Sequence, residues 1–145
     1  MHPDNTGHAE RTAVTIRSAF LPHNDPDASL AFYRDLLGFE IRDDLAYDGQ
    51  RWLTVAPPDS TVTIVLEPPA AQIGVTTAER DMIAEMMAKG TYAALVLTAD
   101  DLDTVHARLL AGGAELVHAP LDPPHGPRCC AFRDPAGNLI RIDQR

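Results

Sequence analysis

Residues 132–142, FRDPAGNLIRI, decide how the C-terminal part of this chain folds. The segment DPAGN contains four strong turn formers, because proline restricts φ, glycine accepts positive φ, and aspartate and asparagine bond their own backbone. The apolar residues that follow are typical of a strand. The stretch therefore predicts a strand, a tight turn and a closing strand. Arg141 lies within that apolar closing strand, and its role bears on function.

Outward from this stretch, the sequence predicts the same order of elements twice. In the second half we expect a strand at 91–99, a helix within 100–115 that its glycines end, and strands at 114–120, 128–134 and 138–142. In the first half we expect a strand at 14–22, a helix at 27–39, and strands at 39–47, 51–58 and 61–69. The helical spacing leaves open whether Phe32 or Tyr33 faces inward. A loop–helix–glycine unit occurs twice, from Asp25 to Gly38 and from Asp101 to Gly113, and the two copies differ by one residue in length. This repeat indicates two packed copies of one module.

A connector separates the two copies. Thr76 and Glu79 have the spacing of a capping box, and Gly90 is a helix stop, which predicts a helix over 77–89. The apolar side of this helix consists of Met82, Ile83, Met86 and Met87. It covers the core, or it is a flexible methionine-rich lid or a dimer contact.

The composition limits the possible classes of protein. With 145 residues and a net charge of −9, the chain is long enough for one domain and too acidic for a nucleic-acid-binding protein. No apolar run reaches the roughly 18 residues that span a bilayer, and no signal peptide opens the chain. We expect no membrane or nucleic-acid partner and a cytoplasmic location. The expected organisation is a tail at 1–12 and a single domain at 13–145, divided into module one (14–69), the connector (70–90) and module two (91–145).

Two segments, AFYRDLLGFE at 31–40 and FRDPAGNLIRI at 132–142, resemble the vicinal oxygen chelate superfamily. This superfamily includes glyoxalase I, extradiol dioxygenases, fosfomycin-modifying enzymes and bleomycin resistance proteins. The resemblance covers residues 14–144. It implies an α+β fold in which two βαβββ modules form an open, curled mixed sheet with a shared cavity.

The resemblance also implies four metal-ligand positions, with His, Gln or Glu on the first and last strands of each module. Here two of these positions fall on Ser18 and Ala94, and a third falls on Arg141. The fourth is expected at Ile64 or Leu66. These residues do not form a site for a divalent ion, because alanine offers no ligand and arginine repels a cation. Arg141 instead binds a ligand carboxylate or phosphate, or it pairs with a protein acid or reaches solvent.

One acidic residue and three histidines remain as alternative metal ligands. Glu67 is one protein acid that could pair with Arg141, and we expect it on the opposite side of its strand from the ligand position unless the register shifts by one residue. A displaced site for Zn, Ni, Mn or Fe would use Glu67, His23, His118 or His125. His106 is expected to be exposed.

The resemblance places the candidate ligand-binding residues around the cavity. Ser18 and Phe20 share a strand face, and with Ala94 and Val96 they would form the cavity floor. Trp52 lies at the mouth or packs in the core, Phe132 is a further wall, and a stiff proline-rich loop brings Arg128 near the entrance. The predicted ligand-binding set is Ser18, Phe20, Trp52, Ala94, Val96, Arg128, Phe132 and Arg141. No catalytic residue is predicted.

The adjacent cysteines, Cys129 and Cys130, are expected to be reduced thiols that point to opposite faces of a strand. The function favoured by the sequence is metal-free binding or sequestration of a small, cationic or aromatic molecule, as in antibiotic resistance proteins of this family. The alternatives are a metal-dependent lyase, isomerase or dioxygenase, and an accessory protein without a tight ligand. The resemblance to the resistance proteins implies a homodimer with clefts between the subunits.

Overall fold

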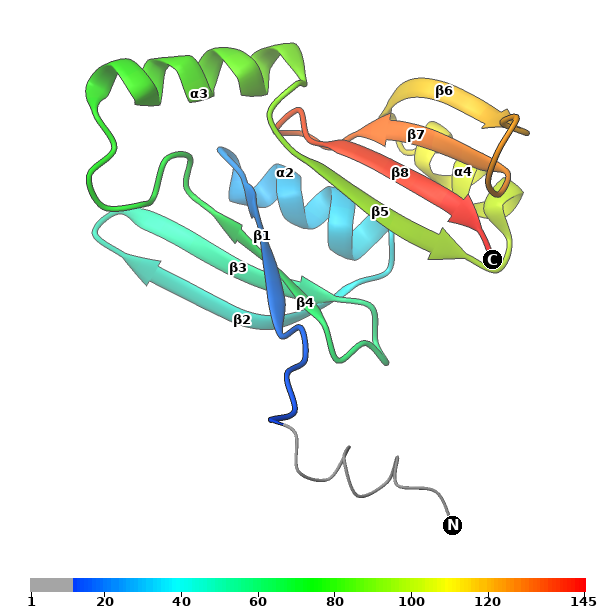
Figure 1. Ribbon diagram of the computed structural model, residues 1–145, viewed down its shortest axis with the longest axis horizontal. Coiled ribbons are helices and arrows are strands. Elements are labelled where there is room, and N and C mark those ends of the chain that lie inside the picture. Colours follow the sequence, from blue (N-terminus) through cyan, green and yellow to red (C-terminus); the bar gives the residue numbers. More distant parts are fainter. Residues whose placement is uncertain (1–11) are drawn as a thin grey trace.

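The structure is a computed structural model and describes residues 12–145 (Figure 1). Apart from residue 12, the expected tail lies outside the described residues. The first module contains β1 (Ser18–Pro22), α2 (Pro26–Leu30), η1 (Ala31–Leu36), β2 (Glu40–Tyr47), β3 (Gln50–Ala56) and β4 (Thr63–Glu67). The connector forms α3 (Thr77–Lys89). The second module contains β5 (Ala94–Ala99), α4 (Leu102–Ala111), β6 (Glu115–Leu121), β7 (Cys129–Arg133) and β8 (Leu139–Gln144).

Each module forms its own four-stranded mixed sheet. The strand orders are β1-β4-β3-β2 and β5-β8-β7-β6, with a parallel pair at β1–β4 and another at β5–β8. The remaining pairs are antiparallel. The predicted α+β class with two βαβββ modules is confirmed. Within the described residues, no helix is both long enough and apolar enough to cross a membrane.

The core lies on one side of each sheet and is completed by α2–η1, which lies between the two sheets (Figure 1). Its members alternate along each strand with residues on the other side, as a half-buried sheet requires. The buried core cluster consists of Leu21, Leu30, Phe32, Tyr33, Phe39, Leu53, Val55, Ile64, Leu66, Leu102, Leu109, Cys130, Phe132, Ile140 and Ile142. The other side of each sheet is therefore turned away from this common core.

The first helix resolves the choice between Phe32 and Tyr33. Its last six residues form a π-helix, in which the amide of Leu37 donates to the carbonyl of Phe32 over 3.0 Å. The wider turn accommodates the one residue by which this unit exceeds its copy in module two. As a result both neighbouring aromatic residues point inward, with Phe32 3% and Tyr33 0% exposed.

The predicted connector helix is confirmed. Thr76 and Glu79 form the capping box, and Gly90 ends the helix in the left-handed conformation. Met87 is buried, whereas Met82 and Met86 are exposed. A Cβ on Gly137 would lie 2.2 Å from the carbonyl oxygen of Met87, so only glycine lets the turn after β7 approach α3 this closely. The helix is thus held near its C-terminal end, and its role as a lid or dimer contact stays a prediction.

Candidate functional site

The side of the β1-β4-β3-β2 sheet that is turned away from the core is called here the first open face. Strand pairing places Phe20 opposite Val65 and Trp52 opposite Leu45 on this side. The members are Ser18, Phe20, Asp43, Leu45, Trp52, Thr54, Thr63, Val65 and Glu67. Three predicted ligand-binding residues, Ser18, Phe20 and Trp52, therefore share one surface, and Trp52 is half-buried there.

The strand register corrects two sequence-based predictions about β4. Ser18 pairs with Thr63 and Pro22 pairs with Glu67, so Glu67 lies on the same face as Ser18. Ile64 and Leu66, one of which we expected to face the cavity, are buried in the core. Both errors have one cause, because a register shift of one residue exchanges the two faces of a strand.

The corresponding side of the β5-β8-β7-β6 sheet is the second open face. Its members include Ala94, Val96, Thr98, Cys129, Ala131, Leu139, Arg141 and Asp143. Val96 pairs with Arg141 in the parallel register, just as Phe20 pairs with Val65 in module one. Ala94, Val96 and Arg141 from the predicted set are thus brought together, on the sheet of the other module.

Arg141 has a protein partner on its own strand. Its Nε donates to Asp143 Oδ1 over 2.7 Å, and this bond raises the pKa of the Arg141 guanidinium. Among the described residues no partner binds its terminal amino groups, and the side chain is 42% exposed. The guanidinium is thus held by Asp143, while its free edge can accept a carboxylate or phosphate.

Two members of the predicted set lie elsewhere. Phe132 is 0% exposed and packs in the core, with its ring centroid 5.7 Å from that of His106. Arg128 donates to Asp103 of α4 over 2.8 Å, on the helical side of the sheet. Neither residue contributes to an open face. His106, expected to be exposed, instead has a buried Nε2 without a hydrogen-bond partner among the described residues.

The first open face carries a groove of about 860 Å³. Hydroxyl groups line one end of it, including those of Ser18 and Thr63, which are 2.7 Å apart. Phe20 and Val65 provide apolar surface, and Arg17 adds a cationic residue. Apolar walls with a few polar anchors are typical of a small-molecule site.

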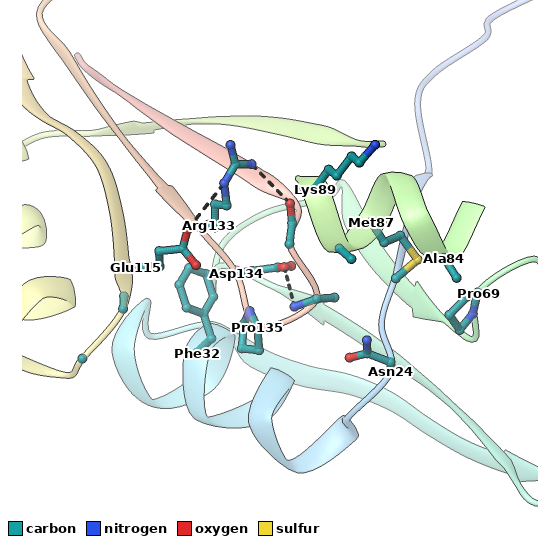
Figure 2. Close-up of a pocket in the computed structure, with 15 residues that line it drawn as sticks. Asn24, Phe32, Pro69, Ala84, Met87, Lys89, Glu115, Arg133, Asp134 and Pro135 are labelled. Atoms are coloured by element: carbon teal, nitrogen blue, oxygen red, sulfur yellow. Dashed lines mark hydrogen bonds and ion pairs between the residues drawn. The ribbon is translucent and has the colours of Figure 1, made fainter. Parts of the chain in front are cut away.

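A second cavity of about 700 Å³ lies where α3, the turn after β7 and α2–η1 meet (Figure 2). Arg133 is its principal charged group and donates to the carbonyl of Gly90 over 2.7 Å, while Glu115 lies 3.6 Å from its Nε. A cation at the carbonyl end of a helix is stabilising, so Arg133 holds α3 in place. The guanidinium of Arg133 is therefore engaged in joining α3 to module two.

The alternative metal ligands are not assembled into one site. Within residues 12–145, no group of three or more His, Cys, Asp or Glu side chains is placed to hold an ion. His23 is buried with both ring nitrogens engaged, since Nε2 lies 2.8 Å from the carbonyl of Arg51 and Nδ1 lies 3.3 Å from Ser29 Oγ. Burial lowers the pKa of His23. His118 bonds its neighbouring carbonyl, and His125 lies in the loop between β6 and β7.

The residues at the metal-ligand positions implied by the resemblance also do not fit a metal ion. Ser18, Ala94 and Arg141 present a hydroxyl, a methyl group and a cation, which do not fit a divalent metal. The cysteines offer no substitute. Cys130 belongs to the core and burial raises its pKa to about 11, while Cys129 is buried on the side of the second open face.

The fold and these two faces define a class of protein, and comparison with known families identifies it. Residues 14–142 match the model of the Glyoxalase/Bleomycin resistance protein/Dioxygenase superfamily. The chain belongs to this superfamily, which confirms the resemblance noted from the sequence. A comparison with curated protein sequences finds no match.

Several solved structures share this fold. UcmS2 is 27% identical with a TM-score of 0.79, over 92% of this chain and 100% of that chain. TnmS3, an antibiotic binding protein from Streptomyces sp. CB03234, is 27% identical with a TM-score of 0.68, over 93% and 98%. A lactoylglutathione lyase from Agrobacterium tumefaciens is 24% identical with a TM-score of 0.62, over 92% and 95%, and supports the fold alone.

Proposed function

We propose that this protein binds and sequesters a small molecule on its open faces without using a metal. The observation that carries the proposal is the pairing of Val96 with Arg141 on the second open face. An arginine with a free guanidinium edge takes the place of a family metal ligand, and Ala94 next to it provides no donor. The surface is therefore suited to binding a ligand directly.

The similarity to TnmS3 supports a natural-product ligand. That protein is an antibiotic binding protein, and its sequence and fold are similar to this chain over nearly the whole length of both. We infer that the ligand is an aromatic or cationic natural product, and that binding confers resistance by lowering its free concentration. The net charge of −9 favours a ligand with a net positive charge, while the free edge of Arg141 can bind an anionic group on the same ligand.

We also propose that the protein is a homodimer in which a second copy covers the open faces. Phe20 and Val96, one on each face, are both 59% exposed in the single chain. Apolar residues on the open side of a sheet are stabilised when a partner removes them from water. Covering each open face with a face from the other subunit would enclose the ligand between subunits.

The experiment has two parts, which address metal dependence and ligand binding. Untagged protein is dialysed against Zn, Ni, Mn and Fe(II), then against clean buffer, and its metal content per chain is measured. The same metal-free protein is screened against natural products by thermal shift, where a ligand at 100 times its Kd adds about 2.7 kcal/mol to the free energy of unfolding. Binding at a metal content near zero supports the proposal.

A metal-dependent enzyme is a second candidate, and the position of Glu67 favours it. Glu67 is the one residue of the predicted alternative ligands found on the first open face, on the same side as Ser18. A metal content near one per chain, lost in a Glu67→Gln variant, would support the enzyme. That result would exclude the metal-free proposal.

A further inference from the structure

The Glu67 carboxylate has no cationic partner within residues 12–145, and no side chain or amide donates to it there. Elsewhere acids lie beside arginines: Asp143 is 2.7 Å from Arg141 on the second open face, and Glu115 is 3.6 Å from Arg133 in the cavity beside α3. These two acids are thus compensated by arginines, whereas among the described residues neither Glu67 nor the exposed Asp43 on the same face has an ion-pair partner. Since the Glu67 side chain is half-buried, this carboxylate loses hydration without gaining a protein cation.

Strand pairing places the only tryptophan next to this carboxylate. The antiparallel pairing of β3 with β4 ends at Leu53 and Leu66, and extending its register by one residue places Trp52 opposite Glu67 on the open face. Directly opposite residues of this kind have Cβ atoms about 5 Å apart. Leu45 pairs with Trp52 on its other side, so the indole lies between an acid and an apolar side chain.

The backbone holds Glu67 in a defined position. Its carbonyl accepts a hydrogen bond from the amide of His23 over 2.8 Å, and the strand is paired with β1 up to this residue. The ring of His23 in turn bonds the carbonyl of Arg51, the residue before Trp52. The strand ends that carry Glu67 and Trp52 are thus joined through one buried histidine.

We propose that Glu67 and Trp52 form a subsite for the cationic group of a planar aromatic ligand. An ammonium or amidinium group there donates a charge-assisted hydrogen bond to the Glu67 carboxylate and makes a cation–π contact with the indole. The flat body of the ligand then lies over Leu45, Trp52 and the apolar surface towards Val65 and Phe20. This inference rests on the proposed function, because it assumes that the first open face binds a ligand. Burial also raises the pKa of Glu67, which is consistent with a carboxylate that lacks a partner.

Two acridines of the same shape test the subsite. At neutral pH 9-aminoacridine is cationic and acridine is neutral, so their affinities for the full chain, measured by calorimetry at physiological salt, isolate the effect of charge. We expect 9-aminoacridine to bind at least about tenfold more tightly than acridine. In Glu67→Gln the ratio should fall to near one, with the affinity for acridine unchanged.

Two further variants serve as controls. Asp59→Asn removes one negative charge from the loop between β3 and β4, at the far end of β4 from Glu67, and should keep the wild-type ratio. Trp52→Leu should weaken both acridines, because it removes the stacking surface. A preference that persists in Glu67→Gln, or that disappears in Asp59→Asn, would assign the effect to general acidity and overturn the subsite.

Failure of the subsite can be told apart from failure of the proposed function. Equal affinities of the two acridines for the wild-type protein, or no binding of either, would overturn the subsite. If the natural-product screen still finds ligands for the metal-free protein, the proposed function survives this result. If that screen also finds none, both proposals fail.

Discussion

The hydroxyl of Tyr33, in the helix of module one, donates a 2.5 Å hydrogen bond to Asp134 Oδ2 in the turn of module two. Asn138 donates to the same oxygen over 2.8 Å and to the carbonyl of Pro22 over 2.9 Å. All of these groups are buried, and burial raises the pKa of Tyr33 well above its usual range, so the phenol stays a donor at neutral pH. The DPAGN turn thus joins the two modules as well as reversing the chain.

Replacing Tyr33 with phenylalanine should destabilise the fold by about 1–3 kcal/mol, because the buried Asp134 carboxylate loses a donor. Urea denaturation followed by far-UV circular dichroism measures the change. The matched control is Tyr47→Phe, which removes an exposed hydroxyl and should change stability by less than about 0.5 kcal/mol. Equal effects in the two variants would mean that the bond between the modules contributes little.

Gly137→Ala should destabilise by more than Gly126→Ala, although both glycines have similar positive φ of 90° and 95°. An alanine at either position has the strain of a left-handed backbone, about 1–2 kcal/mol. Only at Gly137 does the new Cβ also meet backbone, 2.2 Å from Met87 O, whereas nothing lies within 4 Å at Gly126. Chemical denaturation of both variants gives the difference, and identical losses would contradict the close approach of α3.

Glu67→Gln should stabilise the unliganded protein at neutral pH. Burial raises the pKa of Glu67 in the folded state above its value in the unfolded chain, about 4.3, so the ionised side chain disfavours folding above that value. The penalty is relieved as the pH falls through the raised folded pKa. The gain from glutamine should therefore be largest near pH 7 and shrink towards pH 4. Thermal unfolding of both proteins between pH 4 and pH 7 measures this difference in stability. A stability gain that increases on acidification would contradict the predicted direction of the pH dependence.

His106→Leu should stabilise the fold by about 1 kcal/mol, because it removes a buried nitrogen that has no partner among the described residues. The leucine keeps the contact with Phe132. His125→Leu is the control, since that side chain is exposed on a loop. A loss of stability at residue 106 would indicate that a water molecule satisfies the imidazole.

Phe20→Asp should convert the proposed dimer to a monomer by placing a charge on the exposed apolar surface of the first open face. Light scattering at micromolar concentration measures the mass. Ile73→Asp changes an equally apolar side chain that is fully exposed in the connector, and it should leave the dimer intact. A wild-type monomer at this concentration would exclude the shared cleft.

Features set by local chemistry could be predicted from the sequence. The capping box at Thr76 and the stop at Gly90 bound α3 where expected, because both depend only on neighbouring residues. The turn at DPAGN is likewise local. The bond from Tyr33 to Asp134 spans 101 positions in the chain, and no local pattern indicates it.

The faces of the strands were harder to predict. The sequence predicts the correct sides of β1 and β5 for Ser18, Phe20, Ala94 and Val96. Each of these strands is followed by a helix whose start is marked in the sequence, so residue positions can be counted back from that start. Glu67 was assigned to the wrong side because β4 has no such marker, and only its pairing with β1 determines which residues face outward. Phe132 pairs with the core residue Ile140, and this long-range pairing of β7 with β8 turns its ring into the core.

Trp52 is the only tryptophan in the chain and lies on the first open face, next to the acid that we propose as an anchor. Its indole emission therefore reports on this surface alone, with no background from other tryptophans. A shift or quenching on adding a compound would reveal occupancy of the face in the unmodified protein. Natural extracts can be fractionated against this signal before any ligand is known.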